Sequence, residues 1–459
     1  MPAKHRARPD GIDAGFRARW SHGTVAELLR GRNNSMGLLR LGLSLAVLAA
    51  HARILGFGRA EFGHSFTHGQ SDIGKWAVYG FFVLSGILVT RSAARLPLGR
   101  FLWHRALRLL PGLWGCLILT AFVAAPIVYW RVHGTLDGFL DRPHGPIGYL
   151  RSNWRIAIHQ LDVADVMSDA LLAGRVYDGG INGSLWSLYN EVFCYLGVAL
   201  LALTGVLTRA RRVLLLLTVV LGWLVIRQAV STPFWAGPVD SSYPQHLVIP
   251  LFGSLSPAWI VYLGFAFALG AVIEMYKERI PVSDPLAVVS LLALLAGARY
   301  GYLFAVGLPA FAYLLTWLAI RLPAPFHRIG ARHDYSYGMY IYGFLCAQLL
   351  TLFNLNRWGY LPYLTLNIAT TAVLAALSWH CIEQPAMRLK NHTLPFTLRN
   401  PRPLPRPTAL TDQSVHTDGR APTRDRTDRT SLPAGGHTVS GALTRADTRT
   451  EPELTDTKA

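Results

Sequence analysis

The sequence predicts an all-α membrane protein, a polytopic bundle of about ten transmembrane helices with both termini in the cytoplasm. Hydrophobic residues make up 51% of the 459 positions and charged residues only 15%, against about 25% charged in soluble proteins. Long apolar runs recur along the chain, and about 20 such residues cross a hydrocarbon core about 30 Å thick. Basic residues gather in alternate connecting segments, which is typical of multi-pass proteins of a cell (inner or plasma) membrane.

Ten apolar runs are predicted to be spanning helices. They centre on Met36–Phe57, Gly74–Thr90, Leu110–Trp130, Ser184–Leu207, Val213–Arg227, Pro257–Met275, Pro285–Ala298, Gly301–Ile320, Ser336–Phe353 and Leu361–Ile382. The fifth and the seventh are short, so the expected number lies between nine and eleven. Pro and Gly inside these runs do not argue against them, because membrane helices tolerate both residues.

The positions of Lys and Arg predict the orientation, because cytoplasmic loops are enriched in them. Residues 91–108 and 209–212 carry several Arg and no acidic residue, whereas the loops 57–73 and 228–256 are nearly uncharged. An even number of spans then leaves both termini in the cytoplasm. The net charge of +18 is therefore a signal of topology, and no motif for nucleic-acid recognition accompanies it.

Three regions are expected along the chain. A basic cytoplasmic segment covers 1–35, a transmembrane domain covers 36–390, and a tail covers 391–459. The tail is rich in Pro, Thr, Arg and Asp and is expected to be disordered. The largest outer loop, 131–183, is a candidate cap over the bundle. The four cysteines lie in apolar stretches without a C-x-x-C pair, so we expect neither a disulfide framework nor a metal site.

Two basic residues lie inside the first predicted span, where ionisable groups are functional hypotheses by default. Arg40 and His51 are eleven residues apart, about three helical turns, so both lie on one face roughly 16 Å apart. An imidazole there is suited to take a proton from an alcohol. Position alone favours the alternative of a core histidine bonded to a backbone carbonyl, and allows Arg40 to be an anchor at the cytoplasmic surface.

A second candidate is the pair Arg105 and Arg108, which lie three residues apart on one helical face. Two guanidinium groups at the cytoplasmic surface form a fork for phosphate groups, such as those of a coenzyme A donor. The alternative is attraction to anionic membrane lipids, which an isolated R-x-x-R motif favours.

A third candidate is Glu191, a carboxylate in an otherwise apolar run that begins at Trp186. It requires a partner if it is buried, and His51 at a similar depth is suited to that role. The alternative is that Glu191 faces water beside interfacial Trp186 and Tyr189. Glu383 closes the last span and either pairs with one of the arginines or is solvated.

Taken together, these stretches resemble acyltransferase family 3, a family of integral-membrane O-acyltransferases. Five motifs occur in the family's order and cover most of Met36–Lys390. They are Arg40…His51, the run Phe81-Phe-Val-Leu-Ser-Gly-Ile-Leu-Val-Thr90, Arg105-x-x-Arg108-x-x-Pro111, Trp186-Ser…Glu191…Tyr195, and Tyr335-Ser-Tyr-Gly-Met-Tyr340 followed by Ile382-Glu-Gln-Pro385.

The resemblance implies an acyl-CoA donor, usually acetyl-CoA, that binds from the cytoplasm. It implies an acceptor hydroxyl on a carbohydrate, either a lipid-linked or surface glycan or a glycosylated natural product. His51 is then the essential base or proton relay with support from Arg40, and an acyl group carried covalently by His51 is a variant of this role. Arg105 and Arg108 fall in the motif thought to serve the donor.

The second signature of the family contains Trp186, Ser187, Glu191 and Tyr195. By this resemblance we expect Glu191 to act in catalysis and Trp186, Ser187 and Tyr195 to bind substrate.

The chain departs from the family's pattern at two places. Val78-Tyr79-Gly80 stands where relatives often have an acidic or polar residue, and Gly343 stands where they often have a histidine. The alternative function is a membrane transporter or flippase in which Arg40, His51 and Glu191 form a substrate or proton path. Transporters often consist of two related halves, which this sequence does not show. An inactive scaffold that has inherited the motifs is a third interpretation.

Overall fold

The computed structural model describes residues 22–29, 31, 33–156, 159–237, 247–249 and 253–391. All of these lie in one compact unit, Met1–Pro403. The predicted tail from 391 onward, apart from its first residue, and most of the predicted segment 1–35 lie outside the described residues.

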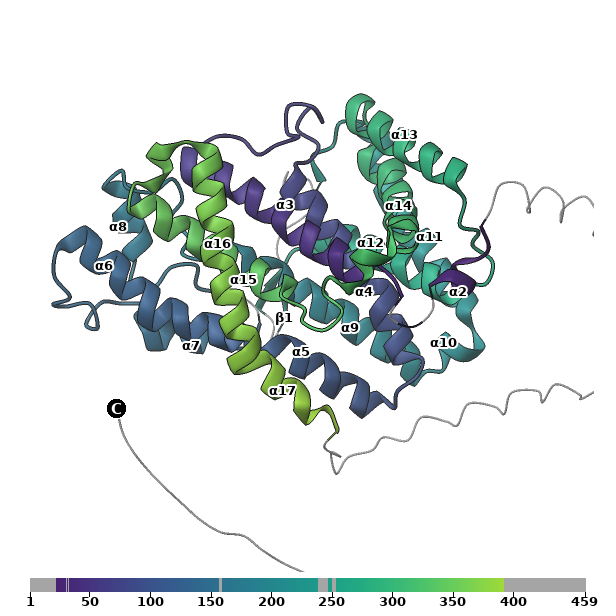
Figure 1. Cartoon of the computed structure of the whole chain (residues 1–459), viewed down its shortest axis with the longest axis horizontal. Helices are drawn as coiled ribbons and strands as arrows, with labels where there is room; N and C mark the ends of the chain where they lie inside the picture. Colours follow the sequence, from purple (N-terminus) through teal and green to yellow (C-terminus); the bar gives the residue numbers. More distant parts are fainter. Residues whose placement is uncertain are drawn as a thin grey trace, which may run out of the picture. The chain divides into compact units, whose positions relative to one another are not determined.

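The protein is an all-α bundle, and each of the ten predicted apolar runs is helical (Figure 1). The long helices are α3 (Met36–Phe57), α4 (Ile73–Ala93), α5 (Leu98–Leu119), α9 (Leu188–Leu203), α11 (Arg211–Ser231), α12 (Pro257–Tyr276), α13 (Asp284–Tyr300), α14 (Leu308–Arg321), α15 (Ser336–Leu352) and α16 (Tyr360–Ser378). Within the described residues, eight helical segments are long and apolar enough to cross a membrane. The other two predicted spans are α13 and α15, which have 17 residues each.

Within the part of the chain that the structure describes, three helices contain a π-helical turn, and a proline explains each. The turns are η1 (Thr120–Ala124) between α5 and α6 (Ala125–His133), η4 (Leu303–Gly307) before α14, and η7 (Trp379–Glu383) between α16 and α17 (Gln384–Arg388). Pro126, Pro309 and Pro385 each follow the end of a π turn by two residues. A proline has no N–H and clashes with the carbonyl four residues before it, so the wider turn accommodates the ring while the helix continues.

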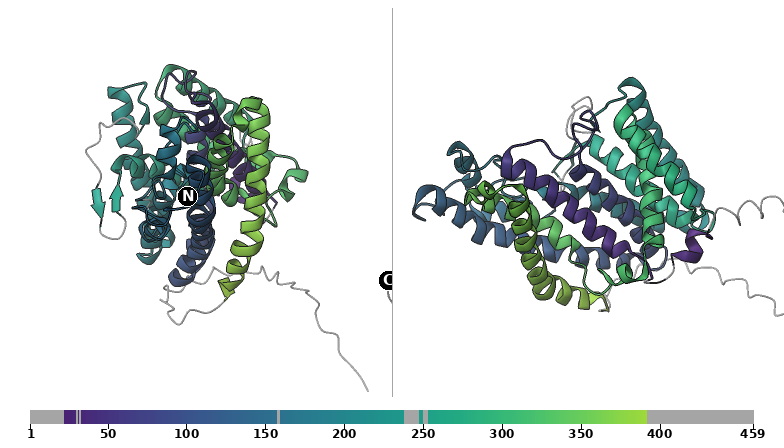
Figure 2. Two further views of the ribbon diagram at one scale, coloured as in Figure 1. Left: turned by 90° about the vertical axis from the view of Figure 1, so that its left-hand side faces the viewer. Right: turned by 45° about the horizontal axis from the view of Figure 1, so that its top comes forward.

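Short elements complete the described part of the chain. They are α2 (Val25–Leu28), α7 (Pro146–Asn153), α8 (Val166–Leu172), η2 (Gly183–Ser187), α10 (Val206–Arg209), η5 (Ala324–Arg328), η6 (Leu355–Trp358), η8 (Leu389–Asn391), and the strands β1 (Leu247–Ile249) and β2 (Gly253–Leu255). The two strands pair in an antiparallel hairpin beside the helices (Figure 2). The predicted outer loop 131–183 contains α7 and α8, and buried Val163, Val166 and Met167 join it to the main hydrophobic core.

The long helices pack in a connected series. α4 lies along α12, α3 lies against both α4 and α15, and α15 lies against α16 (Figure 1). We call the end of the bundle that holds Arg40 the inner end and the end that holds His51 the outer end, following the predicted orientation.

Two glycines bring α4 and α12 into backbone contact. A Cβ atom on Gly86 would lie 2.1 Å from the carbonyl oxygen of Phe267, and one on Gly270 would lie 2.1 Å from that of Val83. No side chain fits at such distances, so each helix presents a glycine to the other's backbone. Small residues of this kind permit close packing of membrane helices, and this explains the glycine in the run that begins at Phe81.

Replacing Gly86 by alanine is expected to separate α4 from α12 and to destabilise the bundle by about 1–3 kcal/mol, the usual range for an overpacked site. Gly197 of α9 is a matched control, because a Cβ there meets nothing within 4 Å. Gly197→Ala should be neutral or stabilising by up to about 1 kcal/mol. Thermal unfolding of the purified variants in detergent measures both effects. An unchanged midpoint for Gly86→Ala would contradict this account of the helix contact.

Candidate functional site

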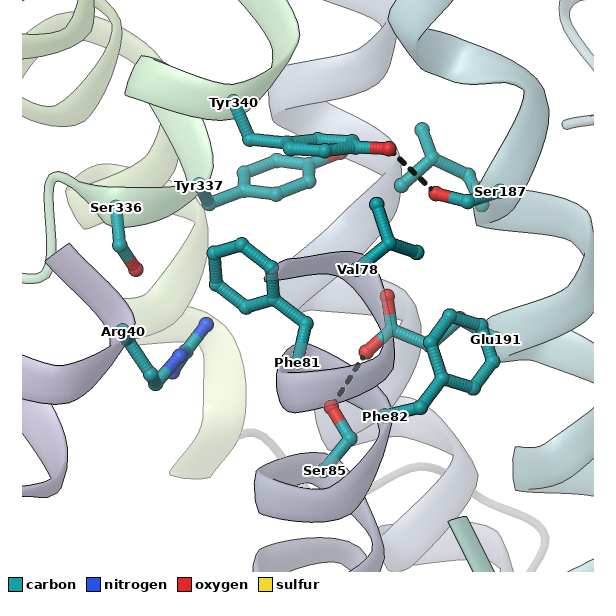
Figure 3. Close-up of a pocket in the computed structure, with 11 residues that line it drawn as sticks. Arg40, Val78, Phe81, Phe82, Ser85, Ser187, Glu191, Ser336, Tyr337 and Tyr340 are labelled. Carbon is teal, nitrogen blue, oxygen red and sulfur yellow. Dashed lines mark hydrogen bonds between the residues drawn. The ribbon is translucent and has the colours of Figure 1, made fainter. Parts of the chain in front are cut away.

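A cavity of about 40 Å³ lies inside the bundle where α3, α4, α9 and α15 meet. Its polar lining residues are Arg40, Ser85, Ser187, Glu191, Ser336, Tyr337 and Tyr340. Arg40 enters from one side and Glu191 from the other, with Phe81 between them (Figure 3). One water needs about 10–15 Å³ of such space, so the cavity has room for a few waters or a small polar group.

A chain of ion pairs closes the inner end of this cavity. The guanidinium of Arg40 donates to Asp334 Oδ2 at 2.6 Å, and that of Arg108 donates to the same oxygen at 2.7 Å. Arg108 also donates to Glu383 Oε2 at 3.0 Å. Asp334 precedes α15, and its other oxygen accepts hydrogen bonds from the backbone N–H and the hydroxyl of Ser336. Burial alone would raise the pKa of Asp334, but Arg40, Arg108 and Ser336 outweigh it and hold the pKa at about 2.

These pairs bear on two of the residues that the sequence singled out, Arg108 and Glu383. Both terminal nitrogens of Arg108 are bound to carboxylates, and its guanidinium lies over the rings of Tyr337 and Trp379, at 5.4 and 5.8 Å from their centroids. Arg108 therefore does not form a free phosphate fork with Arg105. Of the two alternatives for Glu383, the structure shows the pairing with an arginine.

Arg105, the other arginine of the motif, lies near Lys390 at the inner end. Its guanidinium lies over the ring of Tyr195, 5.8 Å from the centroid. In the first half of α5, the side chains of Trp103 and His104 contact the backbone carbonyls of Leu389 and Lys390, which follow α17. Burial, together with the positive charges of Arg105 and Arg108, lowers the pKa of Lys390 to about 8. We call Arg105 and Lys390 the inner cation pair.

Glu191 does not pair with His51 as the sequence led us to expect. Its Oε1 accepts hydrogen bonds from Ser85 at 2.9 Å and from Tyr195 at 2.5 Å. The hydroxyl groups of Ser187 and Tyr340 are 2.7 Å apart at the other side of the cavity (Figure 3).

Trp186, which was expected to bind substrate, is absent from the residues that line this cavity. It packs instead against Trp259 of α12, with 4.3 Å between the ring centroids. Of the three predicted substrate-binding residues, the structure therefore brings Ser187 to the cavity wall, Tyr195 to Glu191, and Trp186 to a helix contact.

His51 lies at the outer end of α3, next to a carboxyl group that the sequence analysis did not single out. Its Nδ1 is 3.9 Å from Glu61 Oε1, and its ring meets the edge of Phe344, with centroids 5.1 Å apart and planes at 73°. Phe344 is one helical turn beyond Tyr340, which lines the cavity. The His51 side chain therefore lies about one turn, roughly 5 Å, beyond the outer edge of the cavity at Tyr340, and about three turns, roughly 16 Å, from Arg40 at its inner edge.

The structure shows the surroundings of the two positions that depart from the family's pattern. A Cβ on Gly343 would lie 2.5 Å from Leu48 Cδ1, so a larger residue at this position requires the Leu48 side chain to move. Tyr79 is buried between Trp76 and Phe304, at 5.6 and 5.5 Å between ring centroids.

Sequence reasoning missed three acidic residues that the structure places at the two ends of α3. Asp334 is an isolated acidic residue in a loop of basic residues, and this isolation is the one sequence signal that could have identified it as a candidate partner for an arginine. Glu61 and Asp72 lie in a loop that was set aside as nearly uncharged. Asp72 precedes an apolar run directly, which is a signal for a helix N-cap, and its side chain does accept the N–H of Lys75. Among the described residues, no three His, Cys, Asp or Glu side chains are grouped to hold a metal ion.

Comparisons with known proteins agree with one another. The sequence profile of a family described as "Acyltransferase domain" matches residues 33–389. An O-acetyl transferase of Shigella phage Sf6 is 31% identical over 361 residues, which cover 77% of this chain and 96% of that relative. Nodulation protein 10 of Rhizobium leguminosarum bv. viciae is 25% identical over 395 residues, which cover 78% of this chain and 95% of that relative. No solved structure matches the chain at a significant level.

Replacing Asp334 by asparagine is expected to destabilise the protein, because Arg40 and Arg108 lose the carboxylate that they share. The expected loss in the free energy of unfolding is about 3 kcal/mol, near the lower end of the range for breaking a buried ion pair, since the Asp334 side chain is 20% exposed. The pKa of Asp334 is about 2 when folded, against an ordinary value of 3.8. Its stabilisation is therefore present above about pH 4 and is lost as the pH falls towards 2.

Thermal unfolding in detergent between pH 3 and 7 measures this effect. The exposed Asp141 gives the matched control, Asp141→Asn, which should leave the unfolding temperature unchanged. If both variants unfold at the same temperature as the parent protein at pH 7, the ion-pair account is wrong.

Proposed function

Because the chain belongs to acyltransferase family 3 and is a membrane O-acyltransferase, we propose that it transfers an acetyl group from acetyl-CoA to a hydroxyl group of a carbohydrate. The sequence resemblance to the family is thereby confirmed. The observation that carries the proposal is the polar cavity between the inner cation pair and His51. In this proposal the protein lies in the cell membrane, the donor binds from the cytoplasm, and the acceptor meets His51 at the outer end.

The inner cation pair supports a donor that carries phosphate groups. Arg105 has an aromatic ring as its neighbour, and burial together with the positive charges of Arg105 and Arg108 lowers the pKa of Lys390. An anion between them would relieve this repulsion, and phosphate oxygens accept charge-assisted hydrogen bonds from both kinds of cation. The 3′-phosphate or the pyrophosphate of coenzyme A has this chemistry. Arg108 contributes by holding α5 in place through Asp334 and Glu383 rather than by binding the donor.

The cavity favours a short acyl group. Its volume of about 40 Å³ matches a few waters, and an acetyl group is of comparable size. The hydroxyl groups of Ser187 and Tyr340 line it, and such donors can stabilise negative charge on a thioester oxygen. Glu191 holds Ser85 and Tyr195 in place, so we assign it a positioning role.

His51 is the proposed base. It removes the proton from the acceptor hydroxyl while the oxygen attacks the thioester carbonyl carbon. The C–S bond then breaks, and the thiolate of coenzyme A receives the proton from the imidazolium, so no proton is gained or lost overall. Base catalysis of this kind commonly contributes about 10²–10⁴ in rate. In the covalent variant, His51 takes the acetyl group first and the acceptor hydroxyl removes it.

Replacing His51 by alanine or glutamine is expected to lower acetyl transfer at least 100-fold, because either change removes the base. Transfer of radiolabel from [¹⁴C]acetyl-CoA to an extractable carbohydrate by membranes that contain the protein measures this. His64 lies exposed in the loop between α3 and α4, and the control variant His64→Ala should retain full activity. Full transfer by His51→Ala would rule out the role of His51. Movement of unmodified carbohydrate across the membrane without label transfer would instead favour the transporter interpretation.

Replacing Lys390 by alanine is expected to raise KM for acetyl-CoA about tenfold, because a hydrogen bond to a charged group contributes about 1.5–3 kcal/mol, while kcat changes little. In the parent protein KM should rise as the pH passes about 8, since Lys390 is charged below this pH and neutral above it. Lys390→Arg should remove this dependence because arginine stays charged. The exposed Arg212 provides the control, Arg212→Gln. An unchanged KM in Lys390→Ala would exclude this donor site.

A further inference from the structure

The ring of His51 leaves one nitrogen buried without a hydrogen-bond partner among the described residues. Nδ1 is that atom, and Glu61 Oε1 at 3.9 Å is the carboxylate oxygen paired with it. Phe344 holds the ring from the side. A buried polar atom without a partner is unfavourable, so a small shift of Glu61 towards Nδ1 stabilises both groups. The geometry therefore favours a contact between this nitrogen and Glu61.

Glu61 is itself held by Asp72. The side chains of Glu61 and Asp72 share a hydrogen bond, and Asp72 is fixed by Lys75, which donates to it from the backbone N–H and from Nζ, each at 2.8 Å. A Cβ on Gly74 would lie 3.2 Å from Glu61 Oε2 and 3.4 Å from Asp72 Oδ1. Glycine at this position thus leaves space for two neighbouring carboxyl groups.

The two carboxyl groups hold one proton between them at neutral pH. Burial and the nearby Asp72 raise the pKa of Glu61 to about 9. Burial opposes ionisation of Asp72 as well, but its hydrogen bonds and charge interactions with Glu61 and Lys75 outweigh burial and lower its pKa. Glu61 is therefore a neutral acid, Asp72 is a carboxylate, and Lys75 balances the charge.

We propose that Glu61 is the positioning residue of His51: one carboxyl oxygen of Glu61 accepts the Nδ1–H of His51, and the other faces the carboxyl group of Asp72. This arrangement selects one imidazole tautomer, because a proton on Nδ1 leaves Nε2 as the basic nitrogen. Asp72 is the anion that orients Glu61, and Lys75 orients Asp72.

The proposal rests on the proposed function, since it gives His51 its working tautomer. When Nε2 takes the proton of the acceptor hydroxyl, the Nδ1–H of the imidazolium stays hydrogen-bonded to Glu61. The nearby Asp72 carboxylate stabilises the positive charge of the imidazolium. Asp72 and Lys75 at the start of α4, and His51 of α3, are the described ionisable groups that act on Glu61. Arg53 of α3 lies near this end with its guanidinium over the ring of Phe62.

Two substitutions at Glu61 separate the proposal from its alternatives. Glu61→Gln keeps a neutral carbonyl for His51 and a donor for Asp72, so kcat should stay within about threefold of the parent value. Glu61→Leu removes both, so kcat should fall about 100-fold while KM for acetyl-CoA is unchanged. The exposed Glu278 gives the control, Glu278→Leu, which should retain full activity.

The pH profile of kcat supplies a readout that a merely structural role would not move. The parent protein should show an inflection near pH 9, where Glu61 loses its proton, and Glu61→Gln should lack it. Asp72→Asn should shift the inflection to lower pH, because Asp72 raises the pKa of Glu61. This variant keeps the proposal testable if Glu61→Leu does not fold.

Three results would overturn the proposal. They are equal losses in Glu61→Gln and Glu61→Leu, full activity in Glu61→Leu, and an inflection near pH 9 that Glu61→Gln retains. An active His51→Ala protein would instead overturn the proposed function, so the two failures are distinguishable.

Discussion

The Asp334 carboxylate, shared by Arg40 and Arg108, is the interaction on which the arrangement of the bundle depends. Arg40 belongs to α3, Arg108 to α5, and Glu383, the second partner of Arg108, to the turn after α16. Asp334 itself precedes α15. Charges this deep are unfavourable unless each is paired, so the ion pairs fix where these elements meet. Because α3 is one continuous helix, fixing Arg40 at the inner end also fixes His51 at the outer end.

The bundle has a different chemistry at each end. The inner end carries the cations Arg105 and Lys390, whereas the outer end carries two carboxyl groups beside a histidine. A narrow polar cavity lies between them. This separation is suited to a reaction whose donor and acceptor approach from opposite sides of a membrane.

The helices could be predicted from the sequence because each apolar run contains its own signal, and all ten runs are helical. The partners of the ionisable residues could not, because they are fixed by contacts between distant parts of the chain. Arg105 and Arg108 share a helical face, yet only Arg108 meets Asp334 and Glu383. Glu191 was expected at the depth of His51, but it lines the cavity with Arg40 and accepts hydrogen bonds from Ser85 and Tyr195. The loop with Glu61 and Asp72 carries no periodic pattern, and only its fold brings both acids to His51.

The central claim, that donor and acceptor are served from opposite ends, is tested most directly in sealed proteoliposomes of uniform orientation. Acetyl-CoA is added on the side of the inner cation pair, and the carbohydrate acceptor is enclosed on the side of His51. The account predicts that labelled acetyl ester forms across the intact bilayer and that acetyl-CoA supplied only on the side of His51 gives none. Ester formation only when donor and acceptor share one compartment would contradict it.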